Sequence, residues 1–281
     1  MQNFTLTISG QDISVLAEDE IRVTTSRKGA GKMAFNLYNK GDLRVSKGDI
    51  AVLAVDGYTM FRGRVTKSLQ NKQKFIKATC HDQILTLVRN KETYVYENKT
   101  ADEVVRMIAG DFGLTLGDVA STGFKVPLRV EDIQALLDII YVAIDLTVIN
   151  TGNLFVLYDD YGSIGSTGGL TLKNIRTLRI NKLISSEEAL EDFEYTEDIG
   201  GSTYNKIKLV RDNEYTGRRD VFIEKDSDNI ARWGLFQLHE KVSDNLTEGQ
   251  VISLAQRKLA LHNRVTSQFY AAYNERAKDN G

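Results

Sequence analysis

The sequence predicts a mainly β protein of the α+β class, and three observations carry this prediction. Stretches in which apolar and polar residues alternate fill residues 1–90 and return from residue 170 onward. Between these regions the apolar spacing changes to the three- and four-residue steps typical of helices. Tight-turn pairs such as Asp56-Gly57 join alternating stretches, which is a hairpin signal. Together they predict a β domain, a helix-containing unit and a second β-rich region in chain order.

Composition narrows the classes of function. The chain has 281 residues, of which 42% are hydrophobic and 26% charged, as in ordinary globular proteins. Its 36 lysines and arginines nearly balance its 38 aspartates and glutamates, giving a net charge of −2. A dedicated nucleic-acid binder is expected to carry a basic excess, so this balance argues against that class.

The sequence also bears on compartment and membrane contact. Cys80 is the single cysteine, so no intramolecular disulfide is expected and a reducing compartment is the simple interpretation. Residues 1–10 lack the basic and apolar parts of a secretory signal. The longest apolar stretch, residues 133–149, is interrupted by two aspartates and is short for a bilayer. No membrane partner is therefore expected.

Residues 1–90 predict a succession of short strands. "FTLTISG", "DEIRVTTS" and "KFIKATCHD" alternate in polarity, and "GDIAVLAVDGYTMFRGRVTKSLQ" places two strands around its Asp-Gly turn. Short strands joined by tight turns are typical of a small barrel or sandwich.

A glycine-rich stretch, "TTSRKGAGKMAFNLYN" at residues 24–39, raises the question of a phosphate-binding loop. Such a loop needs a Gly-Lys-Ser/Thr ending followed by a helix, whereas Lys32 is followed here by Met33. The residues after it alternate like a strand. We therefore expect a turn leading into an edge strand of a barrel wall, and no nucleotide site.

The helix-containing unit opens with a well-marked helix. Thr100 and Glu103 have the spacing of a capping box, and Gly113 suits the left-handed residue beyond a helix end. Apolar residues between them fall on one face. These signals predict a helix from about residue 100 to residue 112.

A second helix is expected from Val130 to about Ile144, because its apolar residues also share one face. A hairpin turning at residues 151–153 is expected to follow it. Helix, helix and hairpin make a compact α+β unit inserted after the first β domain.

Strands are expected to dominate again from residue 170. "LTLKNIRTLRI", "YNKIKLVRD", "RRDVFIEKD", "WGLFQLHEKV" and "VTSQFYAAY" carry strand patterns. Thr247 and Gln250 form a second capping box, which predicts one helix before the last of these strands.

No residue set assembles into a predicted active site. Cys80 and His81 are neighbours on an expected strand and so point to opposite faces, which disfavours a thiol dyad. Asp159 and Asp160 are interpreted as turn formers, not as a pair of hydrolytic acids. The histidines lack metal-ligand spacing. We expect no catalytic residue, no cofactor and no metal, and the protein is predicted not to be an enzyme.

The densest charge run is "EEALEDFEYTED", residues 187–198. It is either a solvated loop or an acidic surface that faces a partner or a channel through which DNA passes, where negative walls prevent sticking. Its acids are Glu187, Glu188, Glu191, Asp192, Glu194, Glu197 and Asp198.

Several segments together resemble the hub proteins of contractile phage tails, of the XkdQ/YqbQ type and similar to late-control D proteins. They include "SRKGAGKMAFNLYN", "GDIAVLAVDGYTMFRGRV", "LVRNKETYVYENKTADEVVRMIAGDFGL", "YNKIKLV", "IEKDSDNIARWG" and "GQVISLAQRKLALHN". The resemblance runs from about residue 20 to residue 263, and the order of the segments makes it specific.

The resemblance implies a fold of two tube-type β-barrel domains with a small inserted α/β domain. On this sequence the expected boundaries are residues 1–92 for the first barrel, 93–165 for the insertion and 166–281 for the second barrel with a helix and strand. This chain has one strand and a polar tail after its last helix, whereas the resembled hubs often run further, which puts closure of the second barrel in question.

It also implies a function. Three copies are expected to form a ring that adapts the hexameric tail tube to the trimeric spike, because each copy supplies two similar barrels. Tube, spike, tape-measure and other baseplate proteins are the implied partners, with DNA in transit if the particle is a phage. The particle that the resemblance implies is a phage tail or a tail-like bacteriocin, which is expected to assemble in the host cytoplasm. A cell-wall hydrolase and a carbohydrate-binding module are the alternatives.

Overall fold

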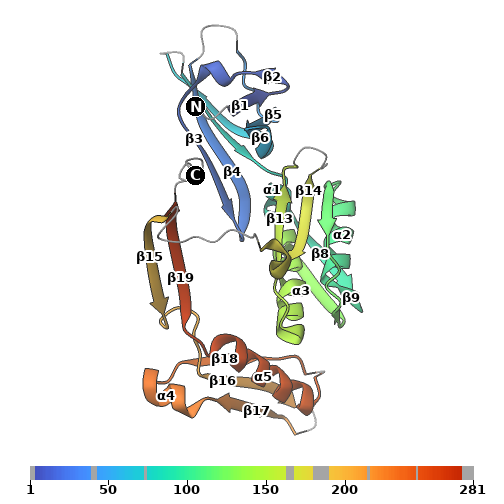
Figure 1. Cartoon of the computed structure of the whole chain (residues 1–281). Helices are drawn as coiled ribbons and strands as arrows, with labels where there is room; N and C mark the ends of the chain where they lie inside the picture. The colour runs from blue at the N-terminus through green and yellow to red at the C-terminus, as the bar shows by residue number, and fades with distance from the viewer. Residues whose placement is uncertain are drawn as a thin grey trace. The chain divides into compact units, whose positions relative to one another are not determined.

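The computed structural model describes most of the chain, and the chain divides into two compact units, residues 1–179 and 180–281 (Figure 1). The described residues are 4–38, 43–72, 75–162, 168–179, 190–213, 216–244 and 246–273, without the side chains of residues 19, 190, 191 and 271–273.

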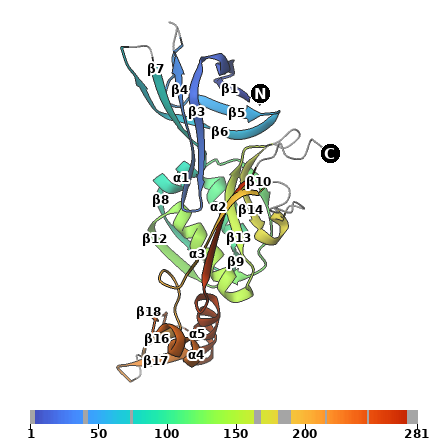
Figure 2. The same cartoon turned by 60° about the vertical axis from the view of Figure 1, so that its left-hand side comes forward.

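The first unit begins with a seven-stranded antiparallel sheet that curls into an open half-barrel (Figure 2). Its strand order is β2-β1-β5-β6-β7-β4-β3. Alternate residues of these strands face inward, as the period-two pattern predicts, and include the fully buried Phe35 and Phe61. The strands are β1 (Phe4–Ile8), β2 (Gln11–Asp12), β3 (Ala17–Ser26), β4 (Gly29–Tyr38), β5 (Ile50–Val55), β6 (Tyr58–Gln70) and β7 (Phe75–His81).

The hairpins of this sheet follow from their turn residues. Asp56 and Gly57 both have positive φ, 47° and 84°, as a tight two-residue hairpin turn requires. The glycine-rich stretch forms the turn between β3 and β4, which confirms a turn in place of a phosphate loop. The expectation of an edge strand was wrong, because β4 pairs on both sides, with β3 and with β7.

The rest of the first unit is a small α/β part with its own core. The core contains apolar residues of α1, α2 and α3 packed with residues of β13 and β14. Its elements are α1 (Ile84–Arg89), β8 (Lys91–Tyr96), β9 (Lys99–Thr100), α2 (Ala101–Asp111), β10 (Leu116–Val119), β11 (Lys125–Val126), β12 (Arg129–Ala135), α3 (Leu136–Thr151), β13 (Phe155–Asp160) and β14 (Gly169–Asn174).

Capping confirms the first predicted helix and corrects the second. The Thr100–Glu103 box is present at α2, and Gly113 has φ 61°. Residues 130–135, expected at the start of the second helix, belong to β12 (Arg129–Ala135) instead, because this strand pairs with β8. The predicted hairpin turning at 151–153 was also wrong. Its first half continues α3, which ends at Gly152 with φ 71° and an N–H donated to the carbonyl of Val148 at 2.8 Å.

The second unit contains two separate sheets in its described part. One is a two-stranded antiparallel ribbon of β15 (Leu190–Asp198) and β19 (Thr266–Tyr273). The other has the order β17-β16-β18 and is packed against a helix through Ile207, Leu209, Val251 and Ala255. Its elements are β16 (Lys206–Asn213), β17 (Arg218–Lys225), α4 (Ser227–Trp233), β18 (Gln237–Lys241) and α5 (Glu248–His262).

The predicted box of Thr247 and Gln250 is present at α5. β14, within the stretch expected to begin the second β region, pairs with β13 and β10 of the first unit. The division at residues 92 and 165 remains a prediction. None of the helices in the described ranges combines the length and apolar character that crossing a bilayer requires.

The buried face of α3 gives a direct test of the α/β core. Ile140→Ala removes a side chain with no exposed surface and is expected to cost about 2–5 kcal/mol of unfolding free energy. Asp138→Ala, on the exposed face of the same helix, is expected to cost less than about 1 kcal/mol. Urea unfolding of both variants checks this, and equal losses would contradict the assigned face.

Candidate functional site

The acidic run predicted from the sequence lies on a strand where the structure describes it. Glu187 and Glu188 fall outside the described residues, as does the side chain of Glu191. Residues 190–198 form β15, so the solvated-loop interpretation is wrong for this part. The remaining acids, all exposed, are Asp192, Glu194, Glu197 and Asp198.

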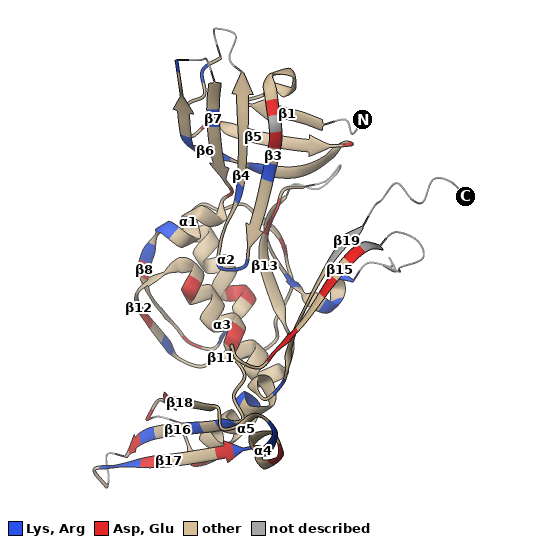
Figure 3. Cartoon of the chain, turned by 90° about the vertical axis from the view of Figure 1, so that its left-hand side faces the viewer, with Lys and Arg blue, Asp and Glu red and all other residues tan. Residues whose placement is uncertain are grey.

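The strand divides these acids between two faces. Because side chains alternate along β15, Asp192, Glu194 and Asp198 share one face of the ribbon. Tyr270 lies directly opposite Glu194 on β19 and is 59% exposed. We call this the acidic face, and Figure 3 shows the acidic positions of β15 in red. Neither β15 nor β19 contains a lysine or arginine.

The other face of the ribbon is aromatic. Phe193 and Tyr195 alternate with the acids, and Phe269 of β19 lies opposite Tyr195. The Phe193 and Phe269 rings stack with centroids 5.9 Å apart, yet these side chains are 59% and 54% exposed. The Tyr195 hydroxyl donates a hydrogen bond to Oε1 of Glu197 at 2.9 Å. Exposed aromatic residues grouped in this way are typical of a protein interface.

The three-stranded sheet has one covered and one open face. Ile207 and Leu209 of β16 point toward α5, so the intervening residues of β16 point to the opposite face. On that open face Val221 and Ile223 of β17 are 51% and 50% exposed. We call this the basic face, after the residues that surround the two apolar side chains: Lys206, Lys208, Arg219, Lys225, His239 and Lys241.

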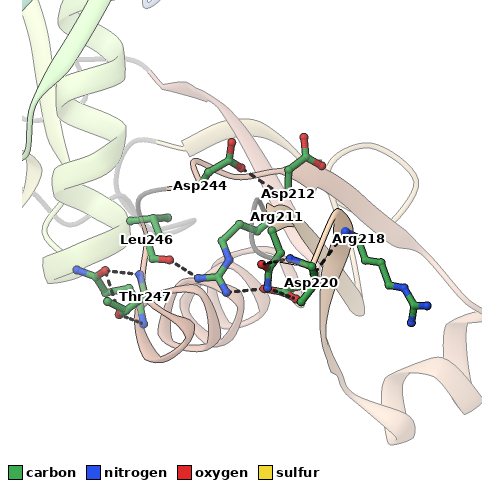
Figure 4. A network of polar contacts seen from close by, with 10 residues as sticks. Arg211, Asp212, Arg218, Asp220, Asp244, Leu246 and Thr247 are labelled. Carbon is green, nitrogen blue, oxygen red and sulfur yellow. Dashed lines mark hydrogen bonds and ion pairs between the residues drawn. The ribbon is translucent and has the colours of Figure 1, made fainter.

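A polar network closes the far end of this sheet (Figure 4). Arg211 bonds Asp220 across the strand pair at 2.5 Å and donates a second hydrogen bond to the carbonyl of Leu246. The guanidinium holds the pKa of the Asp220 carboxyl below its usual value. The backbone N–H of Asp212 donates to Asp244 at 3.1 Å. The network thus joins β16, β17 and the segment that leads into α5.

Sequence reasoning missed a group of buried carboxyls in the first unit. Asp82, just after β7, is 4% exposed and accepts from the backbone N–H of Gly31 at 2.9 Å and of Ile84 at 3.1 Å. It also accepts from the Tyr161 hydroxyl at 3.1 Å. Burial, followed by the charge of Asp159, raises the pKa of Asp82 to about 6.

Asp159 belongs to the same group, so its interpretation as a turn former was wrong. Its two carboxyl oxygens accept from Gln83, from the side-chain amide at 2.6 Å and from the backbone N–H at 3.3 Å. Burial raises its pKa as well. The contacts that tie these residues together span β4, β7 and β13, far apart in the chain, so only the fold brings them together.

A cleft of about 720 Å³ runs past these carboxyls, with Arg62, Arg64, His81 and Thr115 also in its walls. Raised carboxyl pKa values in a cleft are one mark of a functional site. Here, however, each carboxyl oxygen accepts at least one hydrogen bond from the protein itself, and backbone donors from two separate segments take part, which is the geometry of a structural joint between the half-barrel and the α/β part.

The structure separates the remaining sequence candidates. Cys80 is fully buried, and burial raises the pKa of its thiol to about 12, which confirms that it is a core residue beside His81. His81 instead meets the Thr66 hydroxyl at 2.7 Å through Nδ1. Among the described residues, no three His, Cys, Asp or Glu side chains gather closely enough to hold a metal ion.

Comparison with known proteins shows to which family the chain belongs. A family model described as YQBQ-like matches residues 21–272. The chain belongs to the YQBQ-like family. It is 30% identical over 217 residues to the uncharacterized protein YqbQ and 26% identical to the phage-like element PBSX protein XkdQ, both of Bacillus subtilis (strain 168). In each case 77% of this chain is covered, and the chain spans 64% of the relative's length.

Solved structures share the fold of this YQBQ-like chain at low sequence identity. The 43 kDa tail protein of prophage MuSo2 from Shewanella oneidensis matches with a TM-score of 0.62 and 14% identity, covering 96% of this chain and 82% of that one. Prophage tail protein gp18 from Listeria monocytogenes EGD-e matches with a TM-score of 0.59 and 11% identity, covering 95% and 79%. The fold is therefore that of phage tail proteins.

The joint at Asp82 predicts a sharp difference between two glycines. A Cβ on Gly31 would lie 2.3 Å from Oδ2 of Asp82 and 2.4 Å from the Tyr161 hydroxyl, whereas a Cβ on Gly29 meets nothing closer than 3.9 Å. Gly31→Ala is expected to destabilise the first unit by about 1–3 kcal/mol and Gly29→Ala by much less. Urea unfolding checks this, and matched midpoints would contradict the close packing at Gly31.

The raised pKa of Asp82 predicts an unusual pH dependence. Between about pH 4 and pH 6 the folded protein holds a proton on Asp82 that the unfolded chain releases, because the pKa rises from 3.8 to about 6 on folding. Its contribution therefore lowers stability as pH rises through this window, by on the order of 2 kcal/mol. Asp82→Asn is expected to flatten the decline in urea midpoints between pH 4.5 and pH 7. An unchanged slope in this variant would contradict the assignment.

Proposed function

We propose that this YQBQ-like chain is the structural hub of a contractile-tail baseplate. In this proposal three copies form a ring that adapts a hexameric tail tube to a trimeric spike, and the chain is not an enzyme. The ring would belong to a phage tail or a tail-like bacteriocin assembled in the host cytoplasm.

The observation that carries the proposal is the combination of a tail-protein fold with unpartnered surfaces. The first unit holds a curled half-barrel sheet of the kind from which a ring wall can be built. The second unit exposes an aromatic ribbon face that one copy leaves uncovered. A protein built to contact neighbours on several sides needs such surfaces.

Several finer assignments belong to the same proposal. The three-domain division at residues 1–92, 93–165 and 166–281, with a second tube-type barrel, is part of it. The partners are the tail tube, spike, tape-measure and other baseplate proteins, with DNA passing only in a phage. The acids of residues 187–198 are proposed to form an acidic lumen or a partner surface.

The ring is tested by mass. Native mass spectrometry of the chain, alone and mixed with tube and spike proteins from the same tail gene cluster, is expected to give a species of three times 31.5 kDa. A chain that stays monomeric in every mixture would overturn the proposal. Clearing of peptidoglycan in a zymogram would favour a cell-wall hydrolase instead, and glycan-array binding would favour a carbohydrate-binding module.

A further inference from the structure

The basic face of the β17-β16-β18 sheet carries charge that its own chain does not neutralise. Lys206 lies directly opposite Lys225, and Lys208 lies opposite His239. The Lys206–Lys225 pair places like charges opposite each other, which destabilises a sheet. Among the described residues, no ion pair reaches Lys206, Lys208 or Lys225.

Among the described residues of these three strands, Asp212 is the carboxylate on this face, and it is already paired. Asp212 pairs with Arg219 at 3.0 Å and with Lys241 at 2.6 Å. The paired end of the face is thus satisfied, whereas the lysines at the other end surround exposed Val221 and Ile223 without a counter-charge. An apolar centre surrounded by positively charged side chains is typical of a protein interface whose partner is acidic.

The acidic face of the β15–β19 ribbon has the matching pattern. Exposed Tyr270 lies opposite Glu194, Asp192 is the next residue of β15 on the same face, and Asp198 lies four residues beyond Glu194. No ion pair reaches these carboxylates within the described part of the chain. Asp192 and Glu194 are two residues apart on a strand, as are Lys206 and Lys208, so both pairs repeat at about 6.6 Å.

From this match we infer that the basic face of one copy docks on the acidic face of the β15–β19 ribbon of a second copy. The inference rests on the proposed ring and names a contact within it. A contact between two different patches of the same protein is head-to-tail, and it closes into a ring when the rotation between copies allows.

The ribbon does not reach the basic face of its own copy. Two chain segments without strand structure, residues 199–205 and 263–265, connect ribbon and sheet, and the Thr203 hydroxyl links them by donating to the carbonyl of Arg264 at 2.8 Å. At the adjoining end of the ribbon the Thr266 hydroxyl donates to the carbonyl of Asp198 at 2.7 Å. Tyr204 N–H also donates to the carbonyl of His262 at 3.2 Å. Folding the ribbon back would break these contacts, so a second copy is the simpler occupant.

A protein surface fits the basic face better than a nucleic acid does. A phosphate backbone binds cationic side chains and needs no apolar centre between them. Contact with a nucleic acid would therefore bury little of the half-exposed Val221 and Ile223 side chains. An acidic ribbon that exposes Tyr270 gives the two apolar side chains a partner.

Charge reversal on each side tests the contact in the full-length chain. Lys206→Glu with Lys208→Glu, or Asp192→Lys with Glu194→Lys, is expected to weaken self-association about tenfold or more in sedimentation equilibrium. All four changes together restore opposite charges and are expected to recover most of the loss. Lys91→Glu with Lys125→Glu, on exposed positions of β8 and β11 outside the half-barrel sheet, is the control and should change association little.

A cross-link gives a second measurement that does not depend on affinity. Copies carrying Lys208→Cys are mixed with copies carrying Glu194→Cys and oxidised. The docking contact is expected to bring the two introduced cysteines together as a mixed disulfide dimer. The native Cys80 does not compete, because it is fully buried. Neither variant alone should form a disulfide dimer to the same extent.

The outcomes separate the inference from the proposed function. A ring that forms normally with either charge-reversed pair, and without the mixed cross-link, overturns the docking contact and leaves the hub proposal standing. A chain that is monomeric under all conditions overturns both. Binding of a DNA duplex that is lost in Lys206→Glu with Lys208→Glu while association is unchanged would assign the face to nucleic acid and also overturn the contact.

Discussion

A two-stranded ribbon has no interior, and this constraint governs the second unit. A hairpin-like pair of strands is at best marginally stable alone, because neither face buries enough apolar surface. In the β15–β19 ribbon one face carries stacked but exposed aromatic rings and the other carries carboxylates. Phe193, Tyr195 and Phe269 can therefore be buried only by a surface outside the ribbon that packs against this face.

The three-stranded sheet beside it is incomplete in the same way. One helix covers one face through a small core, and the opposite face shows apolar residues among lysines. By contrast, the first unit has two extensive cores and a saturated polar joint at Asp82. The first unit thus has a larger interior of its own, although its two-stranded β8–β12 pair also exposes Val95, Val130 and Ile133. In the second unit, the exposed faces of the ribbon and of the three-stranded sheet are surfaces that association would complete.

Local signals in the sequence predicted much of this fold because they act over a few residues. Period-two alternation identified the strands of the half-barrel, and the boxes at Thr100 and Thr247 marked two helix starts. The α3 hairpin error arose because β-branched residues near its end favour strands, while the buried helix packing overrides that preference. The alternation of Phe193 and Tyr195 with acids was also a strand signal, but the charge density favoured a loop.

The polar joint was not predictable, because its contacts connect residues about fifty to eighty positions apart. Asp82, Gly31 and Tyr161 give no local pattern, and Asp159-Asp160 resembles an ordinary turn. The assignment of the acids to faces likewise needed the register of β15 against β19. The family relationship came from the order of many segments, which constrains the fold more strongly than any one of them.

Amide hydrogen exchange of β15 and β19 tests most directly whether the ribbon is completed by association. The account predicts fast exchange of these amides in the isolated chain and slowing by about tenfold or more in the assembled particle, while β4 and α3 are protected in both states. Equal exchange of the ribbon in the two states would contradict it.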